Sequence, residues 1–455
     1  MAESSLLLVR TKAAHRHDNP GPMKIAIIGA GLAGLCAARS LLDADVGDIT
    51  VFDRRAGPAL ETSHANGALL HPSAVEPWNS PGILRFLLAN LGNEQAPVLL
   101  RLRALPSLLG WGARFVRESS PARHRAHTLA NVSLALRSVQ LMQEVREQGI
   151  EYGTAQRGSL ALHRDIAGFG RAQEHARWLQ DHGVPSRVVH RDELVALEPA
   201  LAATAPTLAG GLHYQGDESG DAYRFCLALA ARLEGRGVRL RWNTEVKALR
   251  TEKGTAHGLV LADANNEGDI EGEEERFDAI VLAAAWWSVA LAAPLGLKLP
   301  VRPAKGYSLT LPLPLPDNGP RPRTPLVDND LHIAVVPVAD EKLRIAGTAE
   351  FCGEDRSIDP VRMGNLMRLL LQVYPQLTDH AASAPRQEWT GLRPMCADGK
   401  PLIGATRVPG LFLNTGHGQL GWTTAAASGE LLACALMRRT APIDAAPFLP
   451  SRFGL

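Results

Sequence analysis

An arginine near the C-terminus, Arg393, carries the clearest chemical signal in this sequence. It stands in the run WTGLRPMCADGKPLIG (389–404), whose glycines and prolines predict a turn. A predicted strand and then a glycine cluster follow it, in the run LFLNTGHGQLGWT (411–423). A planar guanidinium matches a carboxylate through two parallel hydrogen bonds. We therefore predict that Arg393 binds the carboxylate of a small substrate beside a bound cofactor; the alternative is a structural arginine that donates to the carbonyls of the turn.

A glycine-rich turn near the N-terminus predicts a dinucleotide site. The apolar run Lys24 to Ile28 leads into GAGLAG, and a second apolar run, Ile49 to Phe52, follows and ends at an acidic residue. In such a unit the glycines allow a tight turn and a close approach to pyrophosphate, and the acidic group accepts hydrogen bonds from ribose. The N–H groups at the helix start favour the phosphate charge. The expected contacts are Gly29, Gly31, Gly34 and Asp53.

A second glycine cluster favours FAD over NAD as the dinucleotide. It lies directly before a predicted helix, 422–437, whose positive end can stabilise negative charge on the pyrimidine ring of a reduced flavin. An NAD enzyme has no evident need for this second helix terminus. The alternative is a glycine loop that only begins a helix. The cluster consists of Gly416, His417, Gly418, Gln419, Leu420 and Gly421.

Three further side chains are candidates for contact with the substrate. Tyr307, in a predicted strand, is expected to donate to the carboxylate or to line the pocket, with core packing as the alternative. His64 and His417 are candidates for a general base, but a substrate group that loses its proton to solvent would need neither of them. We expect His417 to lie near the cofactor through its backbone. No cysteine has CxxC or histidine-pair spacing, so no metal site is expected.

The predicted elements assign an α/β fold in which two domains are interleaved. A Rossmann-like FAD-binding domain is expected from three separated pieces, 23–82, 206–300 and 390–445. An α+β substrate domain built on an antiparallel sheet is expected from 83–205 and 301–389, with antiparallel strands at 307–313, 332–338 and 343–351. Residues 1–22 contain too short an apolar stretch for a signal peptide and are expected to form a flexible extension.

Composition excludes some classes of protein. The chain has 455 residues and a formal net charge of +1, so nothing in its charge predicts binding to nucleic acid. Its five cysteines do not suggest a disulfide framework, which indicates a reducing compartment. The uncharged run 279–297 is close to the length of a membrane span, but Ser288, Pro294 and Gly296 interrupt it. We expect a buried strand followed by a helical turn there.

Six blocks of sequence resemble the bacterial D-amino-acid dehydrogenases, within the wider D-amino-acid oxidase and glycine oxidase superfamily. The last three blocks are the most specific. Besides the glycine fingerprint they are ALETSHANGALLHPSAVEPWNSPG (59–82), GDESGDAYRF (216–225), KGYSLTLP (305–312), WTGLRPMCADGKPLIG (389–404) and LFLNTGHGQLGWT (411–423). The resemblance implies non-covalent FAD and oxidative deamination of a D-amino acid to a 2-oxo acid and ammonia. A glycine, D-proline or D-hydroxyproline oxidoreductase is the close alternative, and a non-catalytic flavin-binding protein is an alternative of another class.

The resemblance also implies where electrons go and which further residues meet the cofactor. It implies a bacterial protein in the cytoplasm or attached peripherally to the cytoplasmic face of the inner membrane, which passes electrons to a quinone or similar respiratory acceptor. Arg54, Ser63, Asn66 and Val246 are added to the expected cofactor contacts. A GLRP motif in related amine oxidases binds substrate carboxylate, in agreement with the role predicted for Arg393.

Two loops depart from the pattern of these relatives. Their Ser-Ala-Ala-Asn-Ala-Gly-Gln stretch is replaced here by residues 63–69, SHANGAL, which gain a histidine and lose a glutamine. Their Ala-Ala-Gly-x-Trp-Ser stretch is replaced by residues 283–288, so that Ala285 stands where a glycine lets backbone approach the cofactor. These changes concern the range of substrates and the electron acceptor rather than the fold.

Residues 83–117 combine basic and apolar side chains. They contain five arginines and one glutamate, a local charge of +4, interspersed with leucine and aromatic residues. Such a segment is expected to lie on an anionic membrane surface, or to form an ordinary amphipathic face packed on the other domain.

Overall fold

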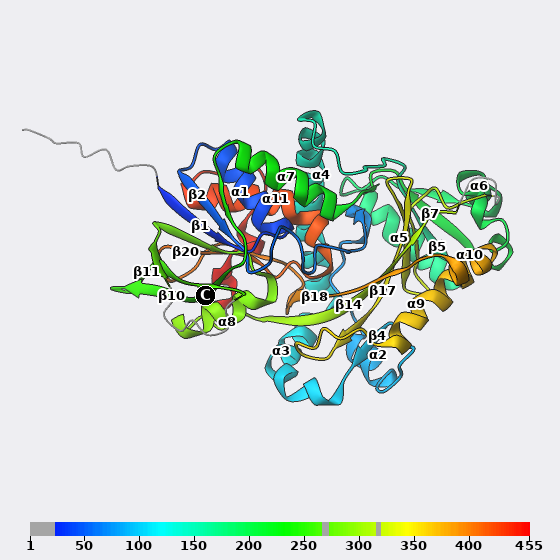
Figure 1. Ribbon diagram of the computed structural model, residues 1–455. Coiled ribbons are helices and arrows are strands. Elements are labelled where there is room, and N and C mark those ends of the chain that lie inside the picture. The colour runs from blue at the N-terminus through cyan, green and yellow to red at the C-terminus, as the bar shows by residue number, and fades with distance from the viewer. Residues whose placement is uncertain (1–22, 266–272, 315–319) are drawn as a thin grey trace, which may run out of the picture.

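Within the residues that the structure describes (23–265, 273–314 and 320–455), two large β-sheets organise the chain in the computed structural model (Figure 1). The first sheet is parallel except at one edge, where β19 runs antiparallel to β20. Its strands, in spatial order, are β19 (Leu402–Ala405), β20 (Leu411–Thr415), β13 (Ala279–Leu282), β1 (Lys24–Ile28), β2 (Asp48–Phe52) and β9 (Arg239–Arg241). The expected β-turn-α-β unit and the buried strand within 277–283 are thereby confirmed.

Helices from distant parts of the chain cover one face of the first sheet, as Figure 1 shows for the blue α1 and the orange-red α11. Gly429 allows their close approach, because a Cβ there would lie 2.4 Å from the carbonyl oxygen of Cys36. Asp221 caps α7 by accepting from the backbone N–H groups of Tyr223 and Arg224. The helices are α1 (Leu32–Asp43), α4 (Pro121–Glu147), α7 (Ala222–Gly235) and α11 (Gly421–Met437).

The other face of the first sheet packs against a smaller antiparallel sheet and a short helix. These elements are β10 (Thr244–Glu252), β11 (Thr255–Asp263), β12 (Glu273–Arg276) and α8 (Ser288–Ala292). The apolar run 279–297 is therefore a strand followed by helical turns, as expected. Among the described residues, no helix combines the length and apolar character needed to cross a membrane.

The second sheet is mainly antiparallel and extends away from the first along the long strands β14, β17 and β18 (Figure 1). Its strands, in spatial order, are β18 (Gln387–Cys396), β14 (Val301–Pro312), β17 (Lys342–Phe351), β16 (Ile333–Val338), β15 (Leu326–Asp328), β5 (Ser159–His163), β7 (Gly210–Tyr214) and β6 (Arg187–Val189), with β4 (Val98–Leu100) beside β17. A separate two-stranded antiparallel sheet pairs β3 (Leu69–Leu70) with β8 (Glu218–Ser219). Remaining helices are α2 (Ile83–Ala89), α3 (Leu105–Arg117), α5 (Ile166–Gln180), α6 (Arg191–Leu197), α9 (Pro360–Val373) and α10 (Thr378–Ser383).

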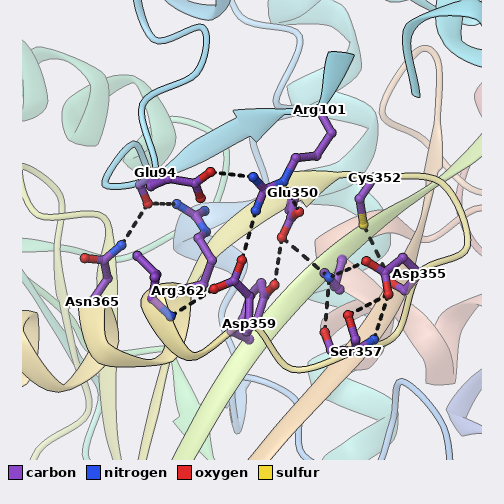
Figure 2. Close-up of polar contacts among 12 residues, drawn as sticks. Glu94, Arg101, Glu350, Cys352, Asp355, Ser357, Asp359, Arg362 and Asn365 are labelled. Atoms are coloured by element: carbon purple, nitrogen blue, oxygen red, sulfur yellow. Dashed lines mark hydrogen bonds and ion pairs between the residues drawn. The ribbon is translucent and has the colours of Figure 1, made fainter. Parts of the chain in front are cut away.

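A buried polar network fastens the segment around β4 to β17 and α9 (Figure 2). Arg101 ion-pairs with Glu94, Glu350 and Asp359. The fully buried Arg362 donates to the backbone carbonyls of Glu94, Ala96 and Ala349 at 2.6 to 3.1 Å. These ion pairs and hydrogen bonds hold β4 and its flanking residues against β17 and α9, although Arg362 Nε has no partner among the described residues.

The sheets do not follow the predicted domain ranges everywhere. Strand β7 belongs to the second sheet, although 206–300 is expected in the nucleotide domain. Strand β18 crosses the boundary expected at 390 and belongs to the second sheet throughout. Helix α4, from the expected substrate domain, packs against the helices of the first sheet. The reason is tertiary pairing: β7 and β18 take partners far away in sequence, which their own residues do not reveal.

Candidate active site

Two cavities that share lining residues form one cleft beside the first sheet; β10 and α8 border one half, and strands of the second sheet border the other. The nucleotide half, about 270 Å³, is lined by Gly29, Asp53, Arg54 and Val246 among others. The substrate half, about 260 Å³, is lined by Asn66, Arg393 and the glycine cluster at His417, Gly418, Gln419 and Gly421. Both halves share Gly31 and Ser63. The cleft therefore gathers most of the residues that the sequence analysis selected from distant parts of the chain.

The glycine fingerprint shapes the floor of the nucleotide half by steric necessity. Gly29 has φ +108°, and a Cβ there would meet the Ala283 carbonyl oxygen at 2.7 Å. A Cβ on Gly34 would lie 1.8 Å from the Gly29 carbonyl oxygen, so Gly34 permits packing and does not line the cleft. Asp53 accepts from the backbone N–H groups of Ala30 at 2.8 Å and Arg55 at 2.9 Å. It thus fastens the glycine turn while bordering the cleft, and burial raises its pKa.

The rim of the nucleotide half carries an arginine cluster. Arg54 donates to Glu61 at 2.8 Å, and its guanidinium lies 4.1 Å from the centre of the Trp287 ring. Glu61 also pairs with Arg55 and with Arg356, and the bound arginines lower its pKa despite burial. These contacts order the side chains around the space where an adenosine would lie.

Arg393 lies in the extended strand β18, not in the turn that its glycine and proline neighbours predict. Pro394 is tolerated because β18 is an edge strand of the second sheet, where a residue without an N–H costs no ladder hydrogen bond. The guanidinium borders the substrate half of the cleft. Its nearest hydrogen-bond acceptor is the Thr348 carbonyl oxygen, at 3.4 Å, and burial lowers the pKa of Arg393 to about 10. No carboxylate of the described residues pairs with it.

Two backbone features of neighbouring strands make room for this guanidinium. Gly306 of β14 lies under it, since a Cβ there would be 2.3 Å from Arg393 Cζ and Nη1. Opposite Gly306 the pairing of β14 with β17 shifts register, and Thr348, at φ +53°, occupies the bulge. A β-branched residue in the left-handed region is strained, and bulges often re-aim groups beside active sites. The strain presents the Thr348 carbonyl to Arg393.

The second glycine cluster forms a turn at the start of α11, as predicted. Gly416 has φ +81° and starts the turn, and the short 3₁₀ turn η9 (Gly418–Leu420) leads into the helix. Leu420 packs into the core behind the cluster. No side chain caps α11, and no acidic residue lies in its first turn, so its N–H groups remain free to meet negative charge.

His417 is buried, and burial lowers its pKa to about 4, so it is neutral near pH 7. Its Nε2 lies 3.1 Å from Ser428 Oγ. The side chain therefore faces the body of α11, which leaves the backbone as the nearer group to a ligand.

The structure places Tyr307 at the substrate half of the cleft with its hydroxyl directed into the protein, and it places His64 outside the cleft. The Tyr307 hydroxyl donates to Glu350 at 2.7 Å, and the ring packs in the core beneath α9. Its one proton is thus committed to an internal carboxylate, which does not favour donation to a substrate, but Tyr307 does line the substrate half of the cleft, as the alternative expectation had it. His64 lies outside the lining of the cleft, with its ring 4.5 Å from Tyr223 and 4.4 Å from Trp389. Aromatic packing, rather than contact with the cavity, accounts for its position.

Several lining residues escaped the sequence analysis. Trp78, Trp389 and Trp422 line the substrate half, and Trp287 lines the nucleotide half. Each lies in or beside a block already selected for another residue, which is the only signal the sequence offers. Cys396, next to this region, is a buried free thiol.

The fold and the cleft together define a dinucleotide-dependent oxidoreductase. In the nucleotide half, the glycine turn leads into α1, whose start has no side-chain cap. In the substrate half, the start of α11, also without a side-chain cap, lies beside the Arg393 guanidinium. The family described as FAD dependent oxidoreductase matches residues 24–435, and the chain belongs to this family. The chain is 40% identical over 424 residues to a D-amino acid dehydrogenase of Paramagnetospirillum magneticum, covering 93% of this chain and 97% of the relative. It is 35% identical to a D-amino acid dehydrogenase of Sinorhizobium medicae, covering 95% and 100%.

Solved structures share the fold at lower identity. Glycine oxidase from Geobacillus kaustophilus superposes with a TM-score of 0.73 at 22% identity, covering 94% of this chain and 99% of that one. L-proline dehydrogenase from P. horikoshii gives 0.70 at 18%, covering 95% and 98%. The interleaved arrangement of a parallel and an antiparallel sheet is therefore the fold of this family.

The cleft fits FAD, the cofactor of the family. The N–H groups at the start of α1, of which Leu32 N makes one long hydrogen bond to Ser63 Oγ at 3.4 Å, would hold the pyrophosphate. A side chain at Gly31 would crowd that space, since its Cβ would lie 3.2 Å from Ser63 Oγ. Asp53 and Arg54 would border the ribose and adenine, and the start of α11 would meet the pyrimidine ring. When bound there, the flavin supplies a two-electron acceptor for hydride from the substrate.

Proposed function

We propose that this protein oxidises small D-amino acids to 2-oxo acids and ammonia, with Arg393 holding the substrate carboxylate. The observation that carries the proposal is a half-buried guanidinium that borders a cavity and has no carboxylate partner among the described residues. Burial of an unpaired charge is costly unless a ligand supplies the counter-charge. The names of the relatives support the D configuration and the dehydrogenase activity.

The residues of the cleft divide the work between binding and orientation. Arg393 binds the carboxylate and thereby fixes Cα, while Gly306 leaves space for the guanidinium. Hydride leaves Cα as the amine becomes an imine, and water then releases ammonia and the 2-oxo acid. Because His64 lies outside the cleft and His417 is neutral and turned toward Ser428, the ammonium proton passes to solvent before oxidation.

Anaerobic mixing with D-alanine and with L-alanine tests this function. We expect bleaching of the flavin absorbance by D-alanine only. Loss of a charge-assisted pair in Arg393→Ala should weaken substrate binding by about 10- to 100-fold. Glycine, D-proline and D-hydroxyproline serve as further substrates. If no D-amino acid bleaches the flavin, the proposed substrate class is wrong, and if Arg393→Ala is reduced as readily as the parent, the anchor is wrong.

We further propose that electrons leave to a quinone at the membrane, to which the protein attaches peripherally. The arginines of 83–117 give this less support than their number suggests, because several are used internally: Arg101 in the network of Figure 2, Arg103 with Asp355, and Arg117 with Glu118. The leucines of the segment give more support. Leu84, Leu88, Leu91, Leu102 and Leu109 are 46% to 70% exposed.

These five leucines define a leucine face on α2, α3 and the chain between them, which lie together at the bottom of Figure 1. Helix α2 buries none of its residues fully, and its two exposed leucines are four residues apart, on one side. Arg85 and Arg114 are exposed and form no ion pair among the described residues, and the one glutamate of the segment, Glu94, pairs with Arg101. Apolar side chains flanked by arginines suit an anionic lipid surface.

Sedimentation with vesicles of phosphatidylcholine and phosphatidylglycerol tests this attachment. A variant with serine at Leu84, Leu88, Leu102 and Leu109 should lose at least about a hundredfold in binding, from the apolar area removed. A matched control places serine at Ile166 and Leu227, which are exposed on other helices. Equal sedimentation of parent and leucine variant would reject the leucine face. Oxygen uptake compared with reduction of a soluble quinone separates the two acceptors.

A further inference from the structure

The Arg393 side chain needs a second contact to fix its orientation, and the sequence does not predict which residue supplies it. Among the described residues its one hydrogen-bond partner is the Thr348 carbonyl oxygen, at the long distance of 3.4 Å, and Gly306 offers it space without a contact group. A flexible guanidinium in such surroundings has several orientations, and only some direct its paired N–H groups at a carboxylate. A rigid neighbouring surface would select one orientation.

The Trp78 ring provides such a surface. Arg393 Cζ lies 5.6 Å from the centre of the ring, within the range of a cation–π contact, and Trp78 also lines the substrate half of the cleft. The indole also packs against the apolar cluster formed by α3, β17 and β18, which includes Trp111 and Phe115. Trp78 therefore joins the anchor to the body of the protein.

The segment that carries Trp78 is fixed on each side. Asn79, fully buried, donates to the Ala397 carbonyl at 3.3 Å. Pro77 packs closely on Gly399, since a Cβ added to Gly399 would lie 2.4 Å from the Cβ of Pro77. The Glu76 carbonyl accepts from the Gln419 side chain at 3.0 Å. One short segment thus contacts the end of strand β18 and the turn before α11, the two elements that form the substrate half.

We propose that Trp78 is a positioning residue that orients the Arg393 guanidinium toward the substrate carboxylate and keeps water from it. The inference rests on the proposed role of Arg393. It assigns specificity for a carboxylate to the pair rather than to the arginine alone. Because the contact acts on the cation, changes at Trp78 affect charged ligands that use Arg393 and leave neutral ligands of the same shape unaffected.

The test compares propanoate with propanamide as ligands of the FAD-loaded protein, measured by calorimetry. Trp78→Leu should raise the dissociation constant of propanoate about 2- to 30-fold and leave that of propanamide unchanged. Trp78→Phe, which keeps a weaker aromatic face, should lie between. Trp111→Phe is the matched control: Trp111 belongs to the same apolar cluster but does not line the cleft. Steady-state kinetics with D-alanine should show the change in KM rather than kcat.

A double-mutant cycle separates the inference from the proposed function. In an Arg393→Met background, Trp78→Leu should have less than a twofold effect on propanoate, because the partner is gone. A full effect in that background, or equal losses for propanoate and propanamide, overturns the inference. If Arg393→Met itself leaves propanoate binding intact, the proposed anchor fails. Should Trp78→Leu not fold, Trp78→Phe in the two backgrounds decides the same question.

Discussion

Replacing Gly306 with alanine tests the geometry of the anchor most directly. The added Cβ would lie 2.3 Å from Arg393 Cζ and Nη1 and 2.5 Å from Nη2. An unstrained contact between such atoms needs roughly 3.5 Å, so the guanidinium must move by about 1.2 Å. Gly306 is not among the glycines with positive φ, so alanine meets no backbone penalty there. The change therefore displaces the cation and little else.

The displacement should lower kcat/KM strongly and the free energy of unfolding only modestly. A misplacement of about 1 Å at a site of orientation can lower activity by about a hundredfold, so we expect kcat/KM for the D-amino acid to fall 10- to 100-fold. The obstructed atoms are the end of a flexible side chain, so the loss in unfolding free energy should stay within about 1 to 3 kcal/mol.

Stopped-flow flavin reduction and urea unfolding, on the same preparation, measure the two effects. Gly364→Ala is the matched control: Gly364 lies inside α9, and a Cβ there meets nothing within 4 Å. That exchange should leave kinetics unchanged and stabilise by about 1 kcal/mol. A Gly306→Ala protein that is folded and keeps kcat/KM within twofold of the parent would refute the view that the position of Arg393 governs the reaction.

Three further substitutions follow from the structure. Tyr307→Phe removes the hydrogen bond to Glu350 and should cost about 1.5 to 3 kcal/mol of stability, yet leave KM unchanged; a large rise in KM would restore the donor role. His417 has its folded pKa lowered to about 4 against 6.5 unfolded, so stability falls as pH decreases from 6.5 toward 4. Between pH 8 and pH 5 the parent should lose about 2 kcal/mol more than His417→Gln in urea unfolding. Ala285 has φ +50°, so Ala285→Gly should raise the unfolding free energy by up to about 1 kcal/mol, and a lower melting temperature would contradict the strain.

The residues that sequence could predict are those whose role is local. Gly29, Gly34 and Asp53 act within one β-turn-α-β unit, and the clash of a Cβ at Gly34 with the Gly29 carbonyl arises within six residues. The same holds for Asp221 at the start of α7 and for the turn before α11. Short-range geometry is written in neighbouring residue types, so the motif and its structure agree.

Roles that depend on distant partners could not be read in this way. The position of Tyr307 in β14 suits a pocket residue. However, Glu350, which accepts the hydrogen bond from its hydroxyl, lies 43 residues away, and the bulge at Thr348 shifts the register between the two strands. Arg393 was expected in a turn because Gly391 and Pro394 flank it, and only the edge position of β18 shows why a strand tolerates them. Trp78 reaches Arg393 across 315 positions of sequence.

Three arginines show what distinguishes a binding residue from a structural one. Arg101 pairs with three carboxylates, which raise its pKa, so its positive charge is already balanced within the protein. Arg344 resembles Arg393 in that burial lowers its pKa to about 10, but it donates to the Asn66 carbonyl at 2.9 Å and does not line the cleft. Burial lowers the pKa of Arg393, its guanidinium borders the cavity, and its hydrogen bond to the Thr348 carbonyl is long. A carboxylate arriving there supplies the missing counter-charge, so the energy of burying Arg393 is recovered in binding the substrate rather than in folding.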